Sequence, residues 1–220
     1  MSSNLRINGD RLTERLLEMA RVGATPKGGV CRVALSDEDK AGRDLFIEWC
    51  RAAGCMVRVD QVGNIFAQRA GLEQDLLPVL TGSHLDSQPT GGKYDGVYGV
   101  LAALEVIETL NDEDIKTRHP IEIVSWTNEE GARFAPGLTG SGVFAGEFKL
   151  DQALSLSDKD GFTFGDELQR IGYAGEIKPG EHSFKAAIEI HIEQGPILEA
   201  AGKTIGVVHG IQGMRWYDLV

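Results

Sequence analysis

The stretch that decides the fold is PVLTGSH (residues 78–84), followed by GVYGVLAALEVIETL (96–110) and IEIVSWT (121–127). The first and third segments are short, apolar and rich in β-branched residues, which is typical of buried strands. In the middle segment apolar residues recur at helical spacing and two glutamates fall on the opposite side, which predicts an amphipathic helix. A strand, a helix and a second strand in this order indicate an α/β unit with parallel strands.

The flanking sequence continues this pattern on both sides. Upstream, apolar spacing predicts a helix through residues 12–20, and Ser36 is a candidate N-cap for a second helix that ends at Gly54. Segments 56–60 and 64–68 read as strands joined by a short turn, which predicts a hairpin. The predicted fold class is α/β, with a mixed, partly parallel sheet flanked by helices. Further downstream we expect short helices near 141–147 and 164–171, strands at 186–193 and 204–209, and little structure in 151–180.

Composition excludes several classes of partner. The chain has 220 residues, 42% of them apolar, and a formal net charge of −11, which argues against the basic patches that bind nucleic acid or anionic membranes. It has no apolar run of the ~18 residues that span a membrane, and its first residues lack the apolar core of a signal peptide. Three cysteines without a C-x-x-C pair are typical of a reducing compartment. We therefore expect a cytoplasmic protein with no nucleic-acid and no membrane partner.

Glycine is concentrated in two segments that follow predicted strands. Five glycines lie within 82–99 and five within 131–146. In α/β sheets, sites form beyond the carboxyl ends of strands, where glycine lets the backbone approach a ligand closely. A third polar group, at 191–194, ends another predicted strand. These three segments are the predicted site.

Histidine and carboxylate side chains in these segments are the ligand types of a divalent-metal site. His84 and His191 offer neutral nitrogen ligands, and Asp95 has two oxygens that can bridge a pair of ions. Asp86, two residues after His84, can accept the proton of the other ring nitrogen and fix the tautomer without touching the ion. Each residue alone is also typical of an ordinary core, cap or surface position. Only the joint pattern indicates a metal site.

The adjacent pair Glu129 and Glu130 follows the predicted strand at 121–127. In an extended segment neighbouring side chains point in opposite directions, so the two glutamates cannot be equivalent ligands. One is expected to bind metal while the other faces the bound water as a general base. Lys93 and Arg133 lie in the same loops and could meet an anionic group, although charges in loops are more often solvated.

Three motifs carry a resemblance to a known family. They are GSHLDSQPTGGKYDGVYGV (82–100), TNEEGARF (127–134) and EIHIEQGP (189–196). The chain resembles the hydantoinase/carbamoylase amidohydrolases, which include N-carbamoyl-L-amino acid hydrolases, allantoate amidohydrolases and β-ureidopropionases, within the dinuclear-metal M20 peptidase superfamily. The short spacing between His84 and Asp95, and the glycine that follows Asp95, favour this branch over the dipeptidases.

The resemblance implies a role for each candidate residue in a dinuclear zinc-peptidase-like catalytic domain. A complete subunit would hold two divalent metal ions, with zinc, manganese, cobalt and nickel all compatible with such ligands. The resemblance assigns His84 and His191 to one ion, Asp95 to the bridge, Glu130 to the second ion, Glu129 to the general base and Gln194 to the ureido group of the substrate.

The resemblance also implies a chain about twice this length. Residues 1–210 would form the metal-dependent catalytic domain, and 211–220 would begin a lid and dimerisation domain that is truncated here, together with the C-terminal return and its further histidine ligand. The full-length parent is then expected to be a homodimer. On this interpretation the 220-residue chain alone is expected to be inactive and to bind at most one metal ion firmly.

The expected reaction is metal-dependent hydrolysis of the C–N bond of N-carbamoyl-amino acids or of related small ureido compounds such as allantoate. Ammonia and CO2 would be released. Two alternatives remain open: an M20-type amino- or dipeptidase with the same metal chemistry, and a folded fragment without turnover.

Overall fold

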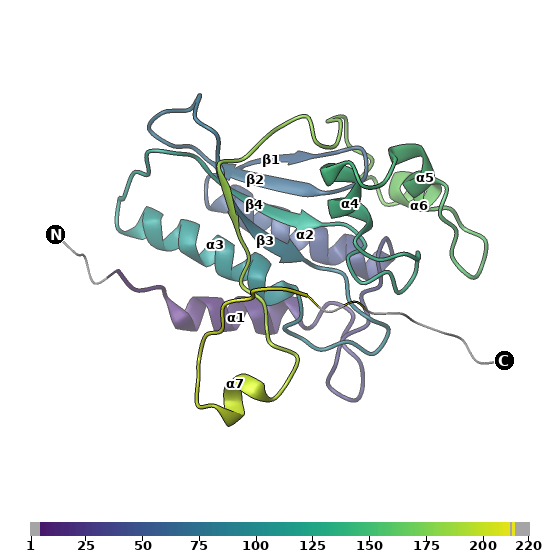
Figure 1. Ribbon diagram of the computed structural model, residues 1–220, viewed down its shortest axis with the longest axis horizontal. Helices are drawn as coiled ribbons and strands as arrows, with labels where there is room; N and C mark the ends of the chain where they lie inside the picture. Colours follow the sequence, from purple (N-terminus) through teal and green to yellow (C-terminus); the bar gives the residue numbers. More distant parts are fainter. Residues whose placement is uncertain (1–4, 212, 214–220) are drawn as a thin grey trace.

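A mixed five-stranded sheet forms the centre of the protein. The computed structural model describes residues 5–211 and residue 213. The strand order is β1-β2-β4-β3-β5, and β3 pairs in parallel with both β4 and β5 whereas β2 pairs antiparallel with β1 and β4 (Figure 1). This confirms the predicted α/β class with a partly parallel sheet. The strands are β1 Met56–Val59, β2 Ile65–Arg69, β3 Val79–His84, β4 Ile121–Trp126 and β5 Ala186–Ile188.

The predicted strand–helix–strand unit is present. Helix α3, Val97–Asp112, connects β3 to β4, whose register runs from Val79 opposite Ile121 to His84 opposite Trp126. Because the two strands are parallel, their carboxyl ends lie side by side at one edge of the sheet. The amino end of α3 returns to this same edge, so that Gly-rich loops gather there.

Helices cover one face of the sheet with the main hydrophobic core. Side chains of Ile65, Ala67 and Ile123 point into this core, and alternate residues such as Phe66 and Val124 point to the other face, as the two-residue period of a strand requires. The second face carries a smaller cluster of aromatic residues. The helices are α1 Gly9–Met19, α2 Asp37–Ala52, α4 Thr139–Ala145, α5 Leu150–Leu154, α6 Phe164–Arg170 and α7 Ile197–Ala200, in addition to α3.

Local signals in the sequence are confirmed in several elements. The Ser36 side chain accepts a hydrogen bond from the Asp39 backbone N–H at the start of α2, as an N-cap does. The hairpin of β1 and β2 and the helices near 141–147 and 164–171 are present. Helices α5 and α7 were not predicted, because a single helical turn leaves too short a periodic pattern.

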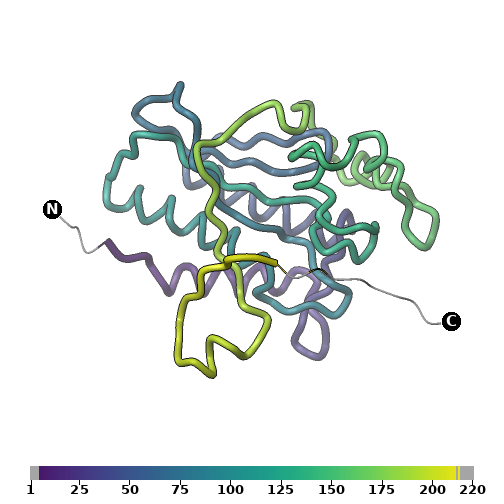
Figure 2. The backbone as a smooth tube through the Cα atoms, in the orientation of Figure 1, coloured from purple at the N-terminus to yellow at the C-terminus, as the bar shows by residue number. Residues whose placement is uncertain are grey.

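The strand predicted at 186–193 is wrong beyond Ile188, and none is formed at 204–209. After Ile188 the chain leaves β3: Glu189 accepts a hydrogen bond from the Ser83 side chain at 2.5 Å, and Ile190 crosses the first turn of α3. The alternating isoleucines therefore do not mark a half-buried strand, and Ile188 remains 60% exposed. Figure 2 follows this segment as a strap from the sheet edge towards α7.

Two further expectations concern residues 211–220 and membrane-spanning helices. The start of a second domain, expected at residues 211–220, falls outside the described residues except for Ile211 and Gly213. Within the described part of the chain, no helix combines the length and the apolar character needed to cross a membrane.

Candidate metal centre

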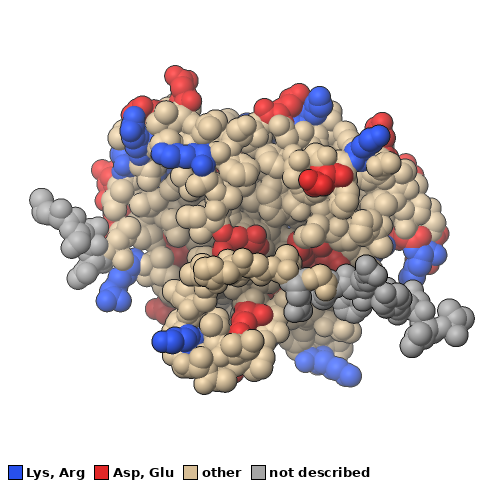
Figure 3. Space-filling view, in the orientation of Figure 1, with Lys and Arg blue, Asp and Glu red and all other residues tan. Residues whose placement is uncertain are grey.

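Three predicted ligands meet at the carboxyl edge of the sheet. His84 is the last residue of β3, Asp95 lies in the loop just before α3, and His191 lies in the strap after β5. One ligand atom of each residue lies within 4.8 Å of the other two. Figure 3 shows acidic side chains gathered near the middle of the molecular face, beside the strap. Because β3 and β5 are parallel neighbours, the residues at and after their carboxyl ends are brought to the same place.

Both imidazoles are oriented by backbone carbonyls. His84 Nδ1 lies 2.9 Å from the carbonyl oxygen of Asp86, and His191 Nδ1 lies 2.8 Å from that of Ile192. A carbonyl can only accept a hydrogen bond, so each neutral ring carries its hydrogen on Nδ1 and keeps a lone pair on Nε2. His191 Nε2 lies 3.2 Å from Asp95 Oδ1. Two imidazole nitrogens and a carboxylate oxygen form a donor set that fits zinc and similar divalent ions.

The glycine after Asp95 leaves room for the first imidazole. A Cβ atom on Gly96 would lie 2.4 Å from His84 Nε2, and its backbone has φ +64°, a conformation that residues with a side chain rarely adopt. Gly96 also precedes the first residue of α3 as its N-cap. The ring therefore packs directly on the backbone at the start of the helix, with the nitrogen that has the free lone pair in this close contact.

Asp86 supports the site in a different way from the one predicted. Its carboxylate Oδ1 lies 3.8 Å from His84 Nδ1, beyond hydrogen-bond distance, because the Asp86 carbonyl takes that place. The carboxylate instead accepts hydrogen bonds from the backbone N–H groups of Glu129 and Glu130, each at 3.2 Å. One buried residue thus orients the imidazole of His84 and anchors the loop that carries both glutamates.

The two glutamates point to different partners. Glu129 Oε2 lies 3.5 Å from His84 Nε2, beside the three-residue group, and its side chain is 32% exposed. Glu130 Oε2 accepts a hydrogen bond from Gln88 Nε2 at 2.7 Å and lies outside the group. The structure therefore brings together three of the four predicted ligands, and it separates the two glutamates as their adjacency required.

Gln194 reaches the same group from the strap. Its side-chain N–H donates a hydrogen bond to Asp95 Oδ2, and its backbone has φ +54°. The neighbouring Glu193 turns away and accepts hydrogen bonds from backbone N–H groups of Ile197 and Leu198 at the start of α7. Asp95 is thus held between the imidazole of His191 and the amide of Gln194.

Burial and neighbouring charges shift the pKa values of the central groups. Burial raises the pKa of the Glu129 carboxyl group, while His84 acts in the opposite direction. For His84, burial favours the neutral ring, but the carboxylates of Asp86 and Glu129 outweigh it and raise the pKa. Burial likewise raises the pKa of Asp86. A raised pKa makes the Glu129 carboxylate a stronger base than an ordinary exposed glutamate.

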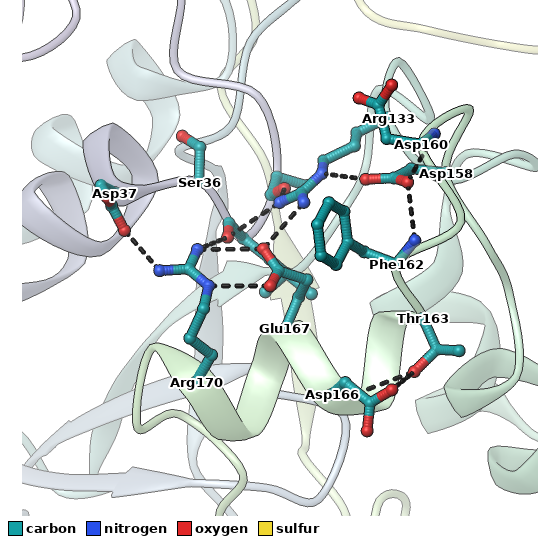
Figure 4. Close-up of polar contacts among 12 residues, drawn as sticks. Ser36, Asp37, Arg133, Asp158, Asp160, Phe162, Thr163, Asp166, Glu167 and Arg170 are labelled. Atoms are coloured by element: carbon teal, nitrogen blue, oxygen red, sulfur yellow. Dashed lines mark hydrogen bonds and ion pairs between the residues drawn. The ribbon is translucent and has the colours of Figure 1, made fainter.

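Arg133 is not part of this group. Its guanidinium forms ion pairs with Asp158 at 2.9 Å and Glu167 at 2.7 Å, and Glu167 also pairs with Arg170 (Figure 4). It also donates to the backbone carbonyls of Ala34 and Leu35. The cation therefore ties the loop after the glutamates to neighbouring loops and to α6, which is a structural role.

Sequence reasoning missed two polar contacts beside the site. Gln88 holds the carboxylate of Glu130, and Ser83 donates to Glu189. Their position within the quoted motifs is the signal that could have indicated them. The other described histidines lie elsewhere: His119 contacts Leu77 and Lys185, His182 contacts Glu122, and His209 is exposed.

Known proteins are similar in sequence to this chain over most of its length. An N-carbamoyl-L-amino-acid amidohydrolase from Rhizobium meliloti is 53% identical over 215 residues, which cover 98% of this chain and 52% of that protein. A ureidoglycolate hydrolase from Arabidopsis thaliana is 39% identical and covers 96% of this chain and 46% of its own length. The chain therefore spans about half the length of these curated relatives.

A solved structure superposes on this chain over a comparable share of its length. A hydantoinase/carbamoylase family amidase from Burkholderia multivorans superposes with a TM-score of 0.91 at 62% sequence identity, over 92% of this chain and 49% of that one. The sequence profile of Peptidase family M20/M25/M40 matches residues 80–216, a range that contains each of the metal-centre residues described above. On these matches and this geometry, the chain belongs to Peptidase family M20/M25/M40.

Proposed function

We propose that this chain forms the catalytic unit of a metal-dependent amidohydrolase that cleaves the C–N bond of N-carbamoyl-L-amino acids or related small ureido compounds. The observation that carries the proposal is the convergence of His84, Asp95 and His191 in a chain 53% identical to an N-carbamoyl-L-amino-acid amidohydrolase. The proposed catalytic unit comprises residues 1–210. The whole protein is proposed to be a cytoplasmic homodimer that associates through a separate lid domain.

In this proposal His84, His191 and Asp95 would hold one ion, and Asp95 and Glu130 would hold a second. Zinc, manganese, cobalt or nickel suits these nitrogen and carboxylate donors. A divalent ion held here would supply Lewis acidity and lower the pKa of a bound water towards ~7. The Nδ1 hydrogen bonds of the two histidines would keep each Nε2 lone pair directed at the ion.

The side chains of this chain handle the protons. Glu129, beside His84 Nε2, takes a proton from the water that attacks the ureido carbonyl carbon and returns it to the terminal nitrogen as the bond between that nitrogen and the carbon breaks. The products are ammonia and a carbamate, and the carbamate loses CO2 to leave the free amine. Gln194 places an amide next to Asp95, where it can contact the ureido group. Asp86 holds the backbone of the glutamate pair and so fixes the direction of the base.

The test is a comparison of substrates with the metal-loaded whole protein. Ammonia release is measured with N-carbamoyl-L-amino acids, ureidoglycolate and allantoate, and peptide-bond cleavage is measured with dipeptides. We expect turnover of about 1 s⁻¹ or faster on at least one ureido compound, a normal enzymatic rate. Preferential cleavage of dipeptides would favour the M20-type peptidase instead, and no turnover on either class would refute the proposed activity.

A further inference from the structure

A fully buried guanidinium group contacts the segment that follows the ligand His84. Arg32 is 0% exposed and is among the largest buried side chains in the described part of the chain. Its guanidinium donates to backbone carbonyl oxygens, and Asp39 and Asp86 act on its charge only from a distance. Burying a cation without a direct ion pair is costly, so the hydrogen bonds of this guanidinium must offset a desolvation penalty.

Arg32 clamps the segment that follows the ligand His84. Its Nε donates to the Leu85 carbonyl oxygen at 2.7 Å, and its backbone N–H donates to Ser87 Oγ at 2.9 Å. In return, the Ser87 backbone N–H donates to the Arg32 carbonyl oxygen at 2.9 Å. The Arg32 backbone therefore pairs with Ser87, and the Arg32 side chain adds the hydrogen bond to Leu85 on the other side of Asp86.

The far end of the guanidinium is itself anchored. One Nη donates to the carbonyl oxygen of Met19, the last residue of α1, at 3.2 Å and to that of Val22, in the turn after the helix, at 2.8 Å. A cation at this end of a helix is favoured by the helix dipole. Arg32 thus connects a rigid helix end to the His84–Ser87 segment.

Asp86 connects the segment held by Arg32 to His84 and to the two glutamates. Its carbonyl oxygen contacts His84 Nδ1, and its carboxylate holds the backbone N–H groups of Glu129 and Glu130. A displacement of the peptide groups next to Asp86 would therefore turn the imidazole of His84 and move the glutamate loop together.

Helix α2 leaves space for this arrangement at Gly42. A Cβ atom on Gly42 would lie 2.9 Å from Arg32 Cδ and 3.4 Å from Met19 Sδ. A methyl group there would displace the aliphatic part of the Arg32 side chain without removing its guanidinium group. This residue offers a second way to disturb Arg32 without replacing it.

We propose that Arg32 is a positioning residue of the metal centre: by holding the Leu85 carbonyl group, its side chain sets the tautomer and direction of His84 and the place of the glutamate loop. Arg32 touches neither ligand atoms nor substrate. The inference rests on the proposed metal site, and it extends that proposal to a buried residue outside the three motifs.

The experiment compares Arg32→Met with a matched control, Arg69→Met. Arg69 is also buried and also donates to a backbone carbonyl, that of Ile115, but it lies at the opposite end of the sheet from His84. The zinc dissociation constant is measured by competition with a chromophoric chelator, and thermal unfolding is followed in parallel. We expect both variants to lose thermal stability, whereas only Arg32→Met weakens zinc binding, by about 10- to 100-fold.

A second readout needs no metal. Nitrogen-15 NMR of the metal-free chain, recorded at a pH at which the His84 ring is neutral, is expected to show the Nδ1–H tautomer in the wild type and in the Arg69 variant, and a mixture of tautomers in Arg32→Met. Should Arg32→Met fail to fold, Gly42→Ala is expected to change zinc affinity and tautomer in the same direction.

The two proposals fail in different ways. Unchanged zinc affinity, within threefold, together with an unchanged His84 tautomer in Arg32→Met, or in Gly42→Ala if the first variant does not fold, would overturn the role of Arg32 alone. A wild-type chain that binds no zinc would overturn the proposed metal site. The tautomer comparison would still decide the role of Arg32 in that case.

Discussion

Glu129 is the residue whose chemistry can be separated most cleanly from metal binding. Its carboxylate lies beside His84 Nε2, but its backbone N–H is held by Asp86 whatever the side chain is. Replacing it by glutamine preserves size and removes the proton acceptor. In the whole protein, Glu129→Gln is expected to lower kcat by roughly 10²–10⁴ with metal content near normal, measured by ammonia release and by mass spectrometry of bound metal.

The neighbouring glutamate provides the control for this prediction. Glu130→Gln removes a carboxylate that lies outside the group of three ligands and contacts Gln88. In the proposed roles it should lower the occupancy of the second ion more than Glu129→Gln does. If Glu129→Gln instead lost metal in proportion to activity, the roles of the two glutamates would have to be exchanged.

The lack of a side chain at Gly96 leads to a prediction about steric fit. Gly96→Ala would place a methyl carbon 2.4 Å from His84 Nε2, in a backbone conformation that disfavours a side chain. We expect zinc binding to fall at least tenfold, because the imidazole must rotate away from Asp95. The matched control is Gly92→Ala, since a Cβ atom on Gly92 meets no atom within 4 Å. Equal zinc affinity in the two variants would contradict this account.

At the scale of elements, the turn between β1 and β2 predicts a pH dependence of stability. The buried Asp60 carboxylate accepts hydrogen bonds from the backbone N–H groups of Val62 and Asn64 and from the Asn64 side chain. Burial nevertheless raises the pKa of Asp60 to about 6. The folded state therefore holds the proton of Asp60 more tightly than the unfolded chain does, and protonation of Asp60 stabilises the fold. This contribution to the free energy of unfolding is complete below pH ~4 and is lost as the pH rises through about 6.

The measurement is urea unfolding of the wild type and of Asp60→Asn between pH 4 and pH 7. The wild type is expected to lose about 2–2.5 kcal/mol relative to the variant over this range, since each unit of pKa difference corresponds to about 1.4 kcal/mol and most of the titration falls between these pH values. Asparagine cannot ionise, so the Asp60 contribution disappears in the variant while other titrating groups remain the same. A constant difference between the two proteins across the range would show that the pKa of Asp60 is not raised.

Elements with a complete local signal could be predicted from the sequence, and elements that depend on distant partners could not. The unit of β3, α3 and β4 and the N-cap at Ser36 follow from periodicity and side-chain chemistry within a few residues. The strand predicted at 186–193 ends at Ile188 because the strap crosses α3, which no local pattern records. The sheet order β1-β2-β4-β3-β5 is non-local in the same sense.

The same distinction applies to the candidate site. Ligand types at strand ends predicted that His84, Asp95 and His191 would converge. Which atom of Asp86 faces His84 depends on the turn of the backbone, so the carbonyl contact could not be predicted from a two-residue spacing. Arg32 interrupts the apolar stretch VCRVAL (30–35), and an isolated charge there is a signal for a buried role.

At the scale of the whole molecule, an ion at this centre would connect segments far apart in the sequence. The end of β3, the start of α3 and the strap after β5 each supply one ligand to the group of His84, Asp95 and His191. Each residue proposed for a second ion already has one carboxylate oxygen hydrogen-bonded to an amide: Asp95 Oδ2 accepts from Gln194, and Glu130 Oε2 accepts from Gln88. A pair of carboxylates without a nitrogen donor is also a weak set for a transition metal.

We therefore expect this chain to bind one zinc ion firmly and to be stabilised against heat by it. At a free zinc concentration 100 times the dissociation constant, linkage adds about 2.7 kcal/mol to the free energy of unfolding, which for a chain of this size raises Tm by about 5–10 °C. Calorimetry gives the Tm, and mass spectrometry under native conditions gives the stoichiometry. The shift should disappear in His191→Ala and persist in His209→Ala, whose exposed histidine lies outside the group. Two ions held with equal firmness, or a shift that survives His191→Ala, would contradict a single three-ligand site.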